Sequence, residues 1–352
     1  MQSFRDLDKH FDLIPAAINR QLSGIDIARG RQEAFAHQHP AALESLKQIA
    51  LVQSVEASNA IENIRAPKKR LEELVAQKTI PRNRSEAEIA GYRAVLDTIH
   101  SNAEHIPFTS NVVRQLHRDL YQFAAQPGGN WKSSDNLVTE ERPDGSVAVR
   151  FTPVSAYETP AAMDELHRRL GESWHADQHH RLLLAGVYAL NFLVIHPFAD
   201  GNGRMSRLLT LLLLCRGGYG VVRFISIERL IEESKETYYE ALAGSTEGWH
   251  QDEHDLRPWL SYLLGVVTAA YREFEPRAEA VTARRGSKAE LVKAFVRSNI
   301  SDAFTFAEVK RAAPGVSDEY IRQVLRELRD ARIIEGTGAG RGAAWHRHRS
   351  DF

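Results

Sequence analysis

Two strongly apolar stretches lie close together near the middle of the chain, at 181–195 and 208–215. Apolar residues fill nearly every position in both, so the pattern predicts two helices that are buried on all sides. The residues between them, 196–207, are polar and rich in glycine. Such a segment is costly to place between two core helices, which indicates a functional site at this turn.

Helical spacing of apolar positions predicts further helices along most of the chain. They are expected at about 40–57, 67–78, 85–105, 111–123, 160–175, 228–242 and 256–274. The pattern changes after Pro127, where short alternating runs flank an Arg-Pro-Asp-Gly turn. These runs predict a β-hairpin over 137–152. The expected fold is therefore mainly α with one hairpin.

The last part of the chain has a different organisation. Charged and small residues at 276–287 are typical of a linker, and helices are expected after it at 289–296, 306–312 and 318–331. Two strands around a glycine-rich turn follow, and this order resembles a winged helix. We predict four segments: an N-terminal helical region at 1–100, a core at 101–275, a linker at 276–287 and a small winged-helix-like domain at 288–352.

Composition narrows the class of protein. The 352 residues carry a formal net charge of −1, which gives no overall attraction to nucleic acid or membrane. A single cysteine, Cys215, excludes an internal disulfide and a cysteine-based zinc site. The apolar runs are too short to span a bilayer, and the residues after Met1 do not form a signal-peptide pattern. We therefore expect a cytoplasmic protein with no membrane partner.

His196 opens the polar segment between the two apolar helices. Pro197 follows it and ends the first helix at or before His196. The imidazole then stands at a helix C-terminus facing whatever the turn binds. A neutral histidine in such a place can act as a general base.

The rest of the segment has the chemistry of a phosphate site. Gly201 and Gly203 permit a turn whose backbone N–H groups form an anion nest at a helix N-terminus. Arg204 and Arg207 are three residues apart and share a helix face, where guanidinium groups suit phosphates. Asp200 supplies a hard oxygen ligand that suits Mg²⁺ bridging phosphates.

The whole string, His-Pro-Phe-Ala-Asp-Gly-Asn-Gly-Arg-Met-Ser-Arg, resembles the signature of the Fic family, His-Pro-Phe-x-[Asp/Glu]-Gly-Asn-Gly-Arg-x-x-Arg. It matches at every defined position. Fic proteins mostly transfer AMP from ATP to a hydroxyl side chain of a target protein. The resemblance covers roughly 40–275 and implies a Fic-type helical bundle in which the 137–152 hairpin is a flap that docks the target. The family usually carries an arginine near the start of the flap segment, where this chain has Lys132.

The resemblance also implies roles for individual residues. His196 would remove the proton from the target hydroxyl, and Asp200 would hold Mg²⁺ across the phosphates of ATP. Tyr239, within Tyr-Tyr-x-x-Leu, resembles the family segment that borders the adenine. The residues expected to bind the nucleotide are Gly201, Asn202, Gly203, Arg204, Met205, Ser206, Arg207 and Tyr239.

A second, shorter motif lies on the predicted helix before the core. Residues 58–63, Ser-Asn-Ala-Ile-Glu-Asn, resemble the inhibitory motif of Fic proteins, [Ser/Thr]-x-x-x-Glu-[Gly/Asn]. By this resemblance Ser58, Glu62 and Asn63 form an autoinhibitory element in which Glu62 pairs with Arg207. ATP would still bind, but with its α-phosphate misaligned for attack.

Several alternatives stay open from the sequence. The same residues would serve removal of AMP, with Glu62 orienting a water, or transfer of another phosphate-linked group. An ATP-sensing regulator that binds DNA through the winged helix is a candidate of another class, and a purely structural interaction module is a third. The sequence also leaves open a homodimer, protein or DNA binding by the winged helix, and the identity of the target protein docked near 137–152.

Overall fold

The computed structural model describes residues 2–4, 7–12, 15–38, 40–141, 146–298, 303–337 and 344–347. Its contacts divide the chain into two compact units, Met1–Glu275 and Pro276–Phe352. The expected turn at 142–145 and most of the glycine-rich run at 336–342 lie outside the described residues.

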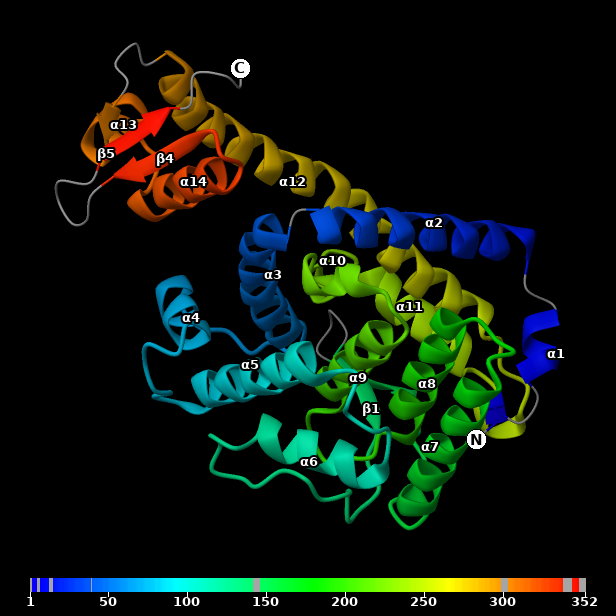
Figure 1. The fold of residues 1–352 in the computed structure, drawn as a ribbon. Coiled ribbons are helices and arrows are strands. Elements are labelled where there is room, and N and C mark those ends of the chain that lie inside the picture. The colour runs from blue at the N-terminus through cyan, green and yellow to red at the C-terminus, as the bar shows by residue number, and fades with distance from the viewer. Residues whose placement is uncertain are drawn as a thin grey trace. The chain divides into compact units, whose positions relative to one another are not determined.

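The first unit is mainly helical, as the apolar pattern predicted (Figure 1). Its helices are α1 Leu7–Asp12, α2 Ala16–Gln38, α3 Pro40–Ile61, α4 Lys68–Val75, α5 Arg84–Asn102, α6 Ser110–Leu120, α7 Thr159–Ala176, α8 Arg181–Ile195, α9 Asn202–Arg216, α10 Ile227–Glu233, α11 Lys235–Thr246 and the first part of α12, Arg257–Ser298. Short 3₁₀ turns lie at Gln2–Phe4, Gly220–Arg223 and Trp249–Gln251. Within the described ranges, no helix combines the length and apolar character needed to cross a membrane.

Helices α8 and α9 form the centre of the first unit. They pack against each other, and α7, α5, α3 and α11 lie against them. Every residue of α8 except Arg181 and Leu193 is buried, in agreement with the unbroken apolar run. Helix α9 is equally buried, although it carries Arg204 and Arg207, so two guanidinium groups lie in the interior and need partners there.

Helix α3 is fixed to the centre by a buried carboxylate. Glu228, at the start of α10, accepts hydrogen bonds from the hydroxyl groups of Ser54 on α3 (2.7 Å), Tyr92 on α5 (3.2 Å) and Ser226 (3.1 Å). Three donors replace the water that the carboxylate loses on burial. The network holds α3, and therefore the 58–63 segment at its end, in one position relative to α5 and α10.

The predicted hairpin is present as strands β1 Val138–Glu141 and β2 Val147–Phe151, which pair antiparallel. Strand β2 lies against α11. A single helix was expected at 228–242, but the structure has two, α10 and α11, separated at Ser234. The Ser234 hydroxyl donates to the carbonyl of Leu230 (2.7 Å), a local bond that competes with a continuing helix.

The expected end of a helix at Phe274 is also wrong, because α12 continues to Ser298. The stretch at 276–287 is therefore helical, and the separate helix expected at 289–296 is part of α12. Pro276 removes one backbone donor from the helix, but the residues around it are rich in alanine, glutamate and arginine, which favour helix. The boundary between the two units falls inside this helix.

The second unit contains the end of α12 followed by β3 Ala303–Thr305, α13 Phe306–Ala312, α14 Asp318–Asp330, β4 Ile334–Thr337 and β5 Ala344–Arg347. The strands form an antiparallel sheet in the order β3-β5-β4. Ser317 caps α14 as expected, its hydroxyl accepting from the Tyr320 N–H (3.4 Å). Strand β3 was not expected from the sequence. The assignment of this unit as a winged helix stays a prediction.

The close approach of α5 to α6 gives a testable prediction. A side chain at Gly91 would place its Cβ 1.9 Å from the Leu120 carbonyl oxygen, so the two backbones touch there. We expect Gly91→Ala to lower the free energy of unfolding by about 3 kcal/mol in a urea titration. Gly171→Ala is the matched control, because a Cβ there meets nothing within 4 Å. It should raise stability by roughly 0.5–1 kcal/mol, and equal losses in both variants would contradict the packing.

Candidate active site

His196 stands at the C-terminus of α8 in the left-handed conformation, with φ 50°. Its Nδ1–H donates to the carbonyl of Leu193 (3.3 Å), which leaves Nε2 as the atom that can accept a proton. Burial lowers the pKa of His196 to about 4, and the nearby Lys132 charge acts in the same direction. The imidazole is therefore neutral near pH 7, as a general base must be.

The turn after His196 is fixed by Asn202, the first residue of α9. Its side-chain oxygen accepts from the Phe198 N–H (2.9 Å), and its amide nitrogen donates to the Phe198 carbonyl (2.8 Å). Both polar atoms of the Asn202 side chain are therefore hydrogen bonded within the turn in this conformation. Gly201 has φ +80°, and a Cβ there would lie 2.9 Å from the Tyr121 hydroxyl, which accounts for a glycine at this position.

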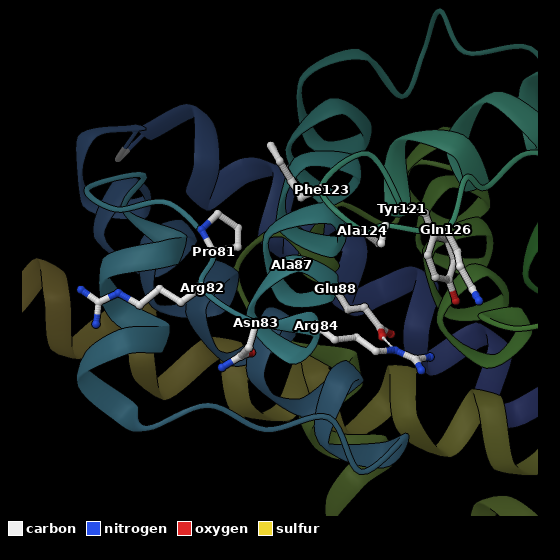
Figure 2. Close-up of a pocket in the computed structure, with 11 residues that line it drawn as sticks. Pro81, Arg82, Asn83, Arg84, Ala87, Glu88, Tyr121, Phe123, Ala124 and Gln126 are labelled. Carbon is white, nitrogen blue, oxygen red and sulfur yellow. Dashed lines mark hydrogen bonds and ion pairs between the residues drawn. The ribbon is translucent and has the colours of Figure 1, made fainter.

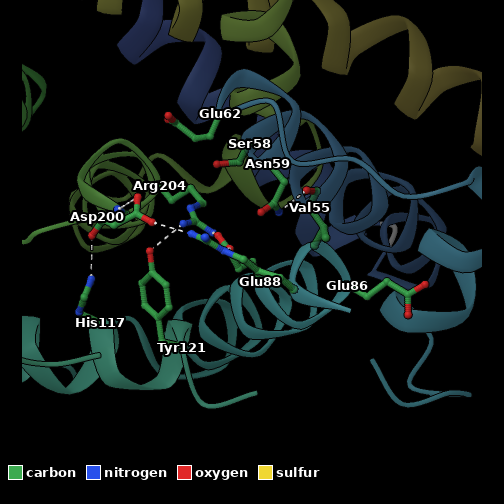
Figure 3. A network of polar contacts seen from close by, with 12 residues as sticks. Val55, Ser58, Asn59, Glu62, Glu86, Glu88, His117, Tyr121, Asp200 and Arg204 are labelled. Atoms are coloured by element: carbon green, nitrogen blue, oxygen red, sulfur yellow. Dashed lines mark hydrogen bonds and ion pairs between the residues drawn. The ribbon is translucent and has the colours of Figure 1, made fainter. Parts of the chain in front are cut away.

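His117, on α6, supports the same turn from below. Its Nδ1 accepts from the Gly129 N–H (2.8 Å), so Nε2 carries the proton and donates to the carbonyl of Asp200 (3.0 Å; Figure 3). The ring stacks on Phe198 with 3.6 Å between centroids. Burial lowers the pKa of His117 to about 4, which keeps the ring in this neutral form. This role of His117 was not predicted, because no sequence pattern distinguishes a histidine of this kind from others on a helix.

The first turn of α9 faces Glu62. A Cβ at Gly203 would lie 2.2 Å from Glu62 Oε1, so the carboxylate rests directly on the backbone of this turn. The N–H groups at a helix start have no partner within the helix and favour an anion. Farther along, the Met205 N–H donates to the Gly201 carbonyl (2.9 Å). The side chains of Met205 and Ser206 are buried, and neither lines the cavity described below.

Arg207 binds the end of α3. Its Nη2 donates to Glu62 Oε1 and to the Ser58 carbonyl, both at 2.8 Å, and its Nε donates to the Ser58 hydroxyl at 2.8 Å. The guanidinium is 3% exposed, whereas the Glu62 side chain is 33% exposed. Ser58, Glu62 and Arg207 thus come together as the motif resemblance predicted.

Asn63 explains how Glu62 reaches this position. Helix α3 ends at Ile61, and Asn63 takes the left-handed conformation with φ 59°. The Ile64 N–H bonds the Asn59 carbonyl (2.9 Å) and the Asn63 N–H bonds the Ala60 carbonyl (3.0 Å), the pair that defines a Schellman motif. Asn63 therefore acts through backbone geometry: the chain turns away after Glu62, and the carboxylate projects from the helix end.

Arg204 has a different environment from Arg207. It is 1% exposed, its Nη1 lies 2.7 Å from Glu88 Oε2, and its Nη2 donates to the Tyr121 hydroxyl (2.9 Å; Figure 3). Arg204 does not line the cavity that Arg207 lines. In this conformation its guanidinium is therefore not placed to contact a phosphate in that cavity. Glu88 and Tyr121 come from α5 and the end of α6, and neither was predicted as a site residue.

Asp200 lies at the solvent-exposed rim of the turn, with its side chain 59% exposed. Oδ1 accepts from the Gly201 N–H (2.6 Å), and Oδ2 lies 3.3 Å from Arg84 Nη2. Arg84 also donates to Glu88 (2.7 Å), which links the rim to the buried Arg204. An exposed carboxylate beside an open helix start has the donor chemistry that a hard divalent cation needs.

One cavity of about 530 Å³ lies at this turn. Its lining joins the three regions singled out from the sequence: the end of α3 with Glu62, the α8–α9 turn with His196, Gly203 and Arg207, and α11 with Tyr239. Arg150 on the flap lies 4.6 Å above the Tyr239 ring. A second cavity, of about 440 Å³, lies beside Glu88 and Phe123 (Figure 2). It contains neither His196 nor Arg207, so we assign the active site to the first.

Comparison with known proteins agrees with this geometry. Residues 107–214, which run from the residues before α6 into α9, match the model of the Fic/DOC family. The chain carries a Fic domain. The proteins named "Protein adenylyltransferase Fic" of Drosophila melanogaster and Drosophila erecta are 24% and 25% identical to it over 257 and 261 residues, 72% of this chain and 47% of each relative. The chain thus spans about half the length of these curated relatives.

Solved structures share the fold of this Fic domain. A Fic family protein from Desulfovibrio desulfuricans G20 is 22% identical, with a TM-score of 0.61 over 96% of this chain and 98% of that one. Fic-1 from C. elegans is 22% identical, with a TM-score of 0.59 over 75% and 74% of the two chains. At these identities the likeness shows the fold alone. The Fic-type helical bundle expected from the signature is therefore confirmed.

The buried ion pair of Arg204 gives a second prediction. Glu88→Ala should lower the free energy of unfolding by about 3–5 kcal/mol, because it leaves a buried guanidinium without its counter-charge. Arg84→Ala removes the other partner of Glu88, but Arg84 is 74% exposed, so a much smaller loss is expected. Chemical denaturation of both variants measures the difference. If Glu88→Ala and Arg84→Ala lowered the free energy of unfolding by similar amounts, burial would not explain the stability that these ion pairs contribute.

His117 gives a third prediction, on pH. The unfolded chain binds a proton at this ring below about pH 6.5, while the folded protein binds it only near pH 4, so stability falls as pH falls between these values. The expected contribution is about 1.4 kcal/mol per pH unit. His117→Gln should remove it, and urea titrations from pH 4.5 to 7.5 would then give a shallower slope than wild type. Parallel curves for the two proteins would exclude this role.

Proposed function

We propose that this chain transfers AMP from ATP to a Ser, Thr or Tyr hydroxyl of a target protein, with Mg²⁺ as cofactor. The observation that carries the proposal is one cavity that contains a neutral His196, the open first turn of α9 and Arg207. A positioned base, a helix N-terminus for anions and a fixed cation are the groups that such a transfer requires. The names of the Drosophila relatives support the same reaction class.

The phosphates of ATP would lie on the first turn of α9, in the place that Glu62 occupies. There the N–H groups of Asn202, Gly203 and Arg204 have no helical partner and the helix dipole favours negative charge. Arg207 would contact the terminal phosphates through Nη2, the nitrogen that now donates to Glu62. Arg204 would contribute its backbone and keep its side chain on Glu88. Tyr239, in the same cavity, would border the adenine.

Asp200 is the group that we propose as the Mg²⁺ ligand, together with phosphate oxygens. Its Oδ2 would exchange the contact with Arg84 for the cation. The cation would offset the negative charge of the phosphate oxygens during transfer.

In the proposed step, the oxygen of the target hydroxyl forms a bond to the α-phosphorus of ATP. His196 Nε2 takes the hydroxyl proton as this bond forms. The bond from the α-phosphorus to the oxygen that bridges to the β-phosphate breaks, and pyrophosphate leaves with that oxygen. The protonated His196 then returns its proton to solvent, which its low pKa favours.

Glu62 would inhibit this reaction in two ways. Its carboxylate occupies the anion site of α9 and saturates Arg207. A triphosphate placed there would meet both a steric obstacle and a like charge. The exposed fraction of 33% leaves Glu62 free to move into water when a ligand or a partner displaces it.

The target would dock on the flap. Among the described residues, β1 pairs only with β2, and Val147 and Val149 are 69% and 56% exposed. An extended target segment could add to a strand edge here, which would bring its hydroxyl toward His196. Dimerisation, a cytoplasmic location and the choice between DNA and protein as partner of the second unit stay predictions.

Loss of Glu62 tests the function. Glu62→Gly removes charge-assisted hydrogen bonds worth about 1.5–3 kcal/mol, so AMP incorporation should rise by about 10- to 100-fold. We would incubate the variant and the wild type with ATP and Mg²⁺ and follow self-modification by intact mass. The Glu62→Gly/His196→Ala double variant is the control and should lose about 10²–10⁴-fold in rate.

Each outcome of this experiment is informative. Equal incorporation in the wild type and Glu62→Gly would refute inhibition by Glu62. Undiminished incorporation in the double variant would refute His196 as the base. If no variant incorporates AMP and calorimetry detects no binding of ATP, the proposed reaction is wrong. Loss of AMP from a pre-labelled protein, dependent on Glu62, would instead assign AMP removal to the same site.

A further inference from the structure

The last four carbonyl groups of α8, which end at the proposed base, all have partners. Within an α-helix, the last four carbonyl groups have no N–H donor from the helix itself. Here His196 satisfies two of them: its backbone N–H bonds the Phe192 carbonyl (2.9 Å) and its Nδ1–H bonds the Leu193 carbonyl (3.3 Å). The Val194 carbonyl accepts from the Val154 N–H (3.2 Å). The last carbonyl, of Ile195, accepts from the ammonium group of Lys132 (3.0 Å).

Lys132 and Val154 lie on the two sides of the flap hairpin, one before β1 and one after β2. Both roots of the flap are therefore hydrogen bonded to the end of the helix that carries His196. The Lys132 N–H also donates to the Pro197 carbonyl (2.8 Å). Asn136, four residues on, donates to the Phe198 carbonyl (3.2 Å) and accepts a second bond from the Lys132 ammonium (2.8 Å). The base of the flap thus contacts the backbone on both sides of His196.

The position of Lys132 is unusual for a lysine. The residue is 5% exposed, and its ammonium group donates hydrogen bonds to two neutral oxygens, the Ile195 carbonyl and Asn136 Oδ1. Burial lowers the pKa of Lys132 to about 8, with Asp135 opposing the shift, so the group is still mainly charged at pH 7. Burying an ammonium group costs free energy unless the charge makes interactions that a neutral side chain cannot make. Capping the negative end of a helix is one such task.

We propose that Lys132 is a positioning residue that holds His196 and the flap in one rigid frame. The inference rests on the proposed function, because it concerns the base and the docking element of that reaction. Lys132 contacts the peptide group that joins Ile195 to His196, so it sets where the imidazole stands. Through Asn136 and its own backbone it also sets where the flap begins. A target hydroxyl held on the flap then meets His196 Nε2 at a fixed distance.

A positioning role makes a specific kinetic prediction. Lys132→Met keeps the length of the side chain and removes the charge and the donors, whereas Lys132→Arg keeps the charge and the donors. In the Glu62→Gly background, Lys132→Met should lower the rate of self-modification at saturating ATP by about 100-fold, since small displacements of a base cost about this much. The KM for ATP should stay unchanged, because no atom of Lys132 lines the anion site at α9. Lys132→Arg should restore most of the rate.

Two results would overturn the positioning role. One is an unchanged rate in Lys132→Met. The other is an equal loss of rate and of melting temperature in Lys132→Met and Lys132→Arg, which would show that the lysine serves only the stability of the fold.

A second measurement does not depend on activity and separates this inference from the proposed function. The ¹H–¹⁵N signals of the His196 ring, assigned with His196→Gln, report the position of the imidazole in the full chain. Lys132→Met should shift and broaden them, and Lys132→Arg should not. Lys235→Met is the matched control, because Lys235 caps the end of α3 through the Ile61 carbonyl (2.9 Å) and does not contact α8 by a hydrogen bond. Ring signals that are unchanged in Lys132→Met, or changed equally in the control, would refute the role even if AMP transfer is confirmed.

Discussion

The pairing of Arg207 with the end of α3 is the interaction on which the site depends. A buried guanidinium needs acceptors, and the N-terminus of a helix favours an anion. The Glu62 carboxylate accepts from Arg207 and lies against the first turn of α9. The same geometry defines what can replace Glu62, because any substitute must be anionic, compact and able to accept from Arg207. A phosphate meets these conditions. In the proposed function, inhibition by Glu62 and binding of the substrate phosphates would therefore meet the same electrostatic requirement.

The α8–α9 turn is rigid because its backbone groups are bonded from many sides. Asn202 holds Phe198, His117 holds the Asp200 carbonyl, and Lys132 holds the end of α8. Each of these partners lies on a different segment, so the bundle must be assembled before the turn has its shape. The histidines are kept neutral by burial, and the glycine at 201 leaves room for the Tyr121 hydroxyl. Preorganisation of this kind lets a site act without rearranging at the moment of reaction.

The sequence predicted the parts of this site that are local and missed those that are not. Pro197 placed His196 at a helix end, which follows from a short-range pattern. The contact of Glu62 with Arg207 was expected only from the resemblance of residues 58–63 to the Fic inhibitory motif. No short-range pattern marks Glu88. In the sequence it resembles a surface residue of an amphipathic helix, and only the packing of α9 against α5 places Arg204 beside it. The continuity of α12 through Pro276 was missed because a proline is a statistical helix stop, not an absolute one. The mainly helical fold and the local parts of the site could therefore be predicted from the sequence, whereas contacts between distant segments could not.

The ion pairs Arg204–Glu88 and Arg207–Glu62 differ in how far their carboxylates are buried. Arg204 and Arg207 lie three residues apart on α9, and each faces a glutamate on another helix or at its end. The Glu88 side chain is 3% exposed, so breaking its pair would leave two charges in the interior, and this pair is a permanent part of the core. Glu62 is 33% exposed, so its carboxylate can be transferred to water while an incoming anion takes over Arg207. The two pairs thus differ in the exposure of the carboxylate and not in that of the arginine. In the proposed function, this difference would let the Glu62–Arg207 pair open while the Glu88–Arg204 pair stays closed.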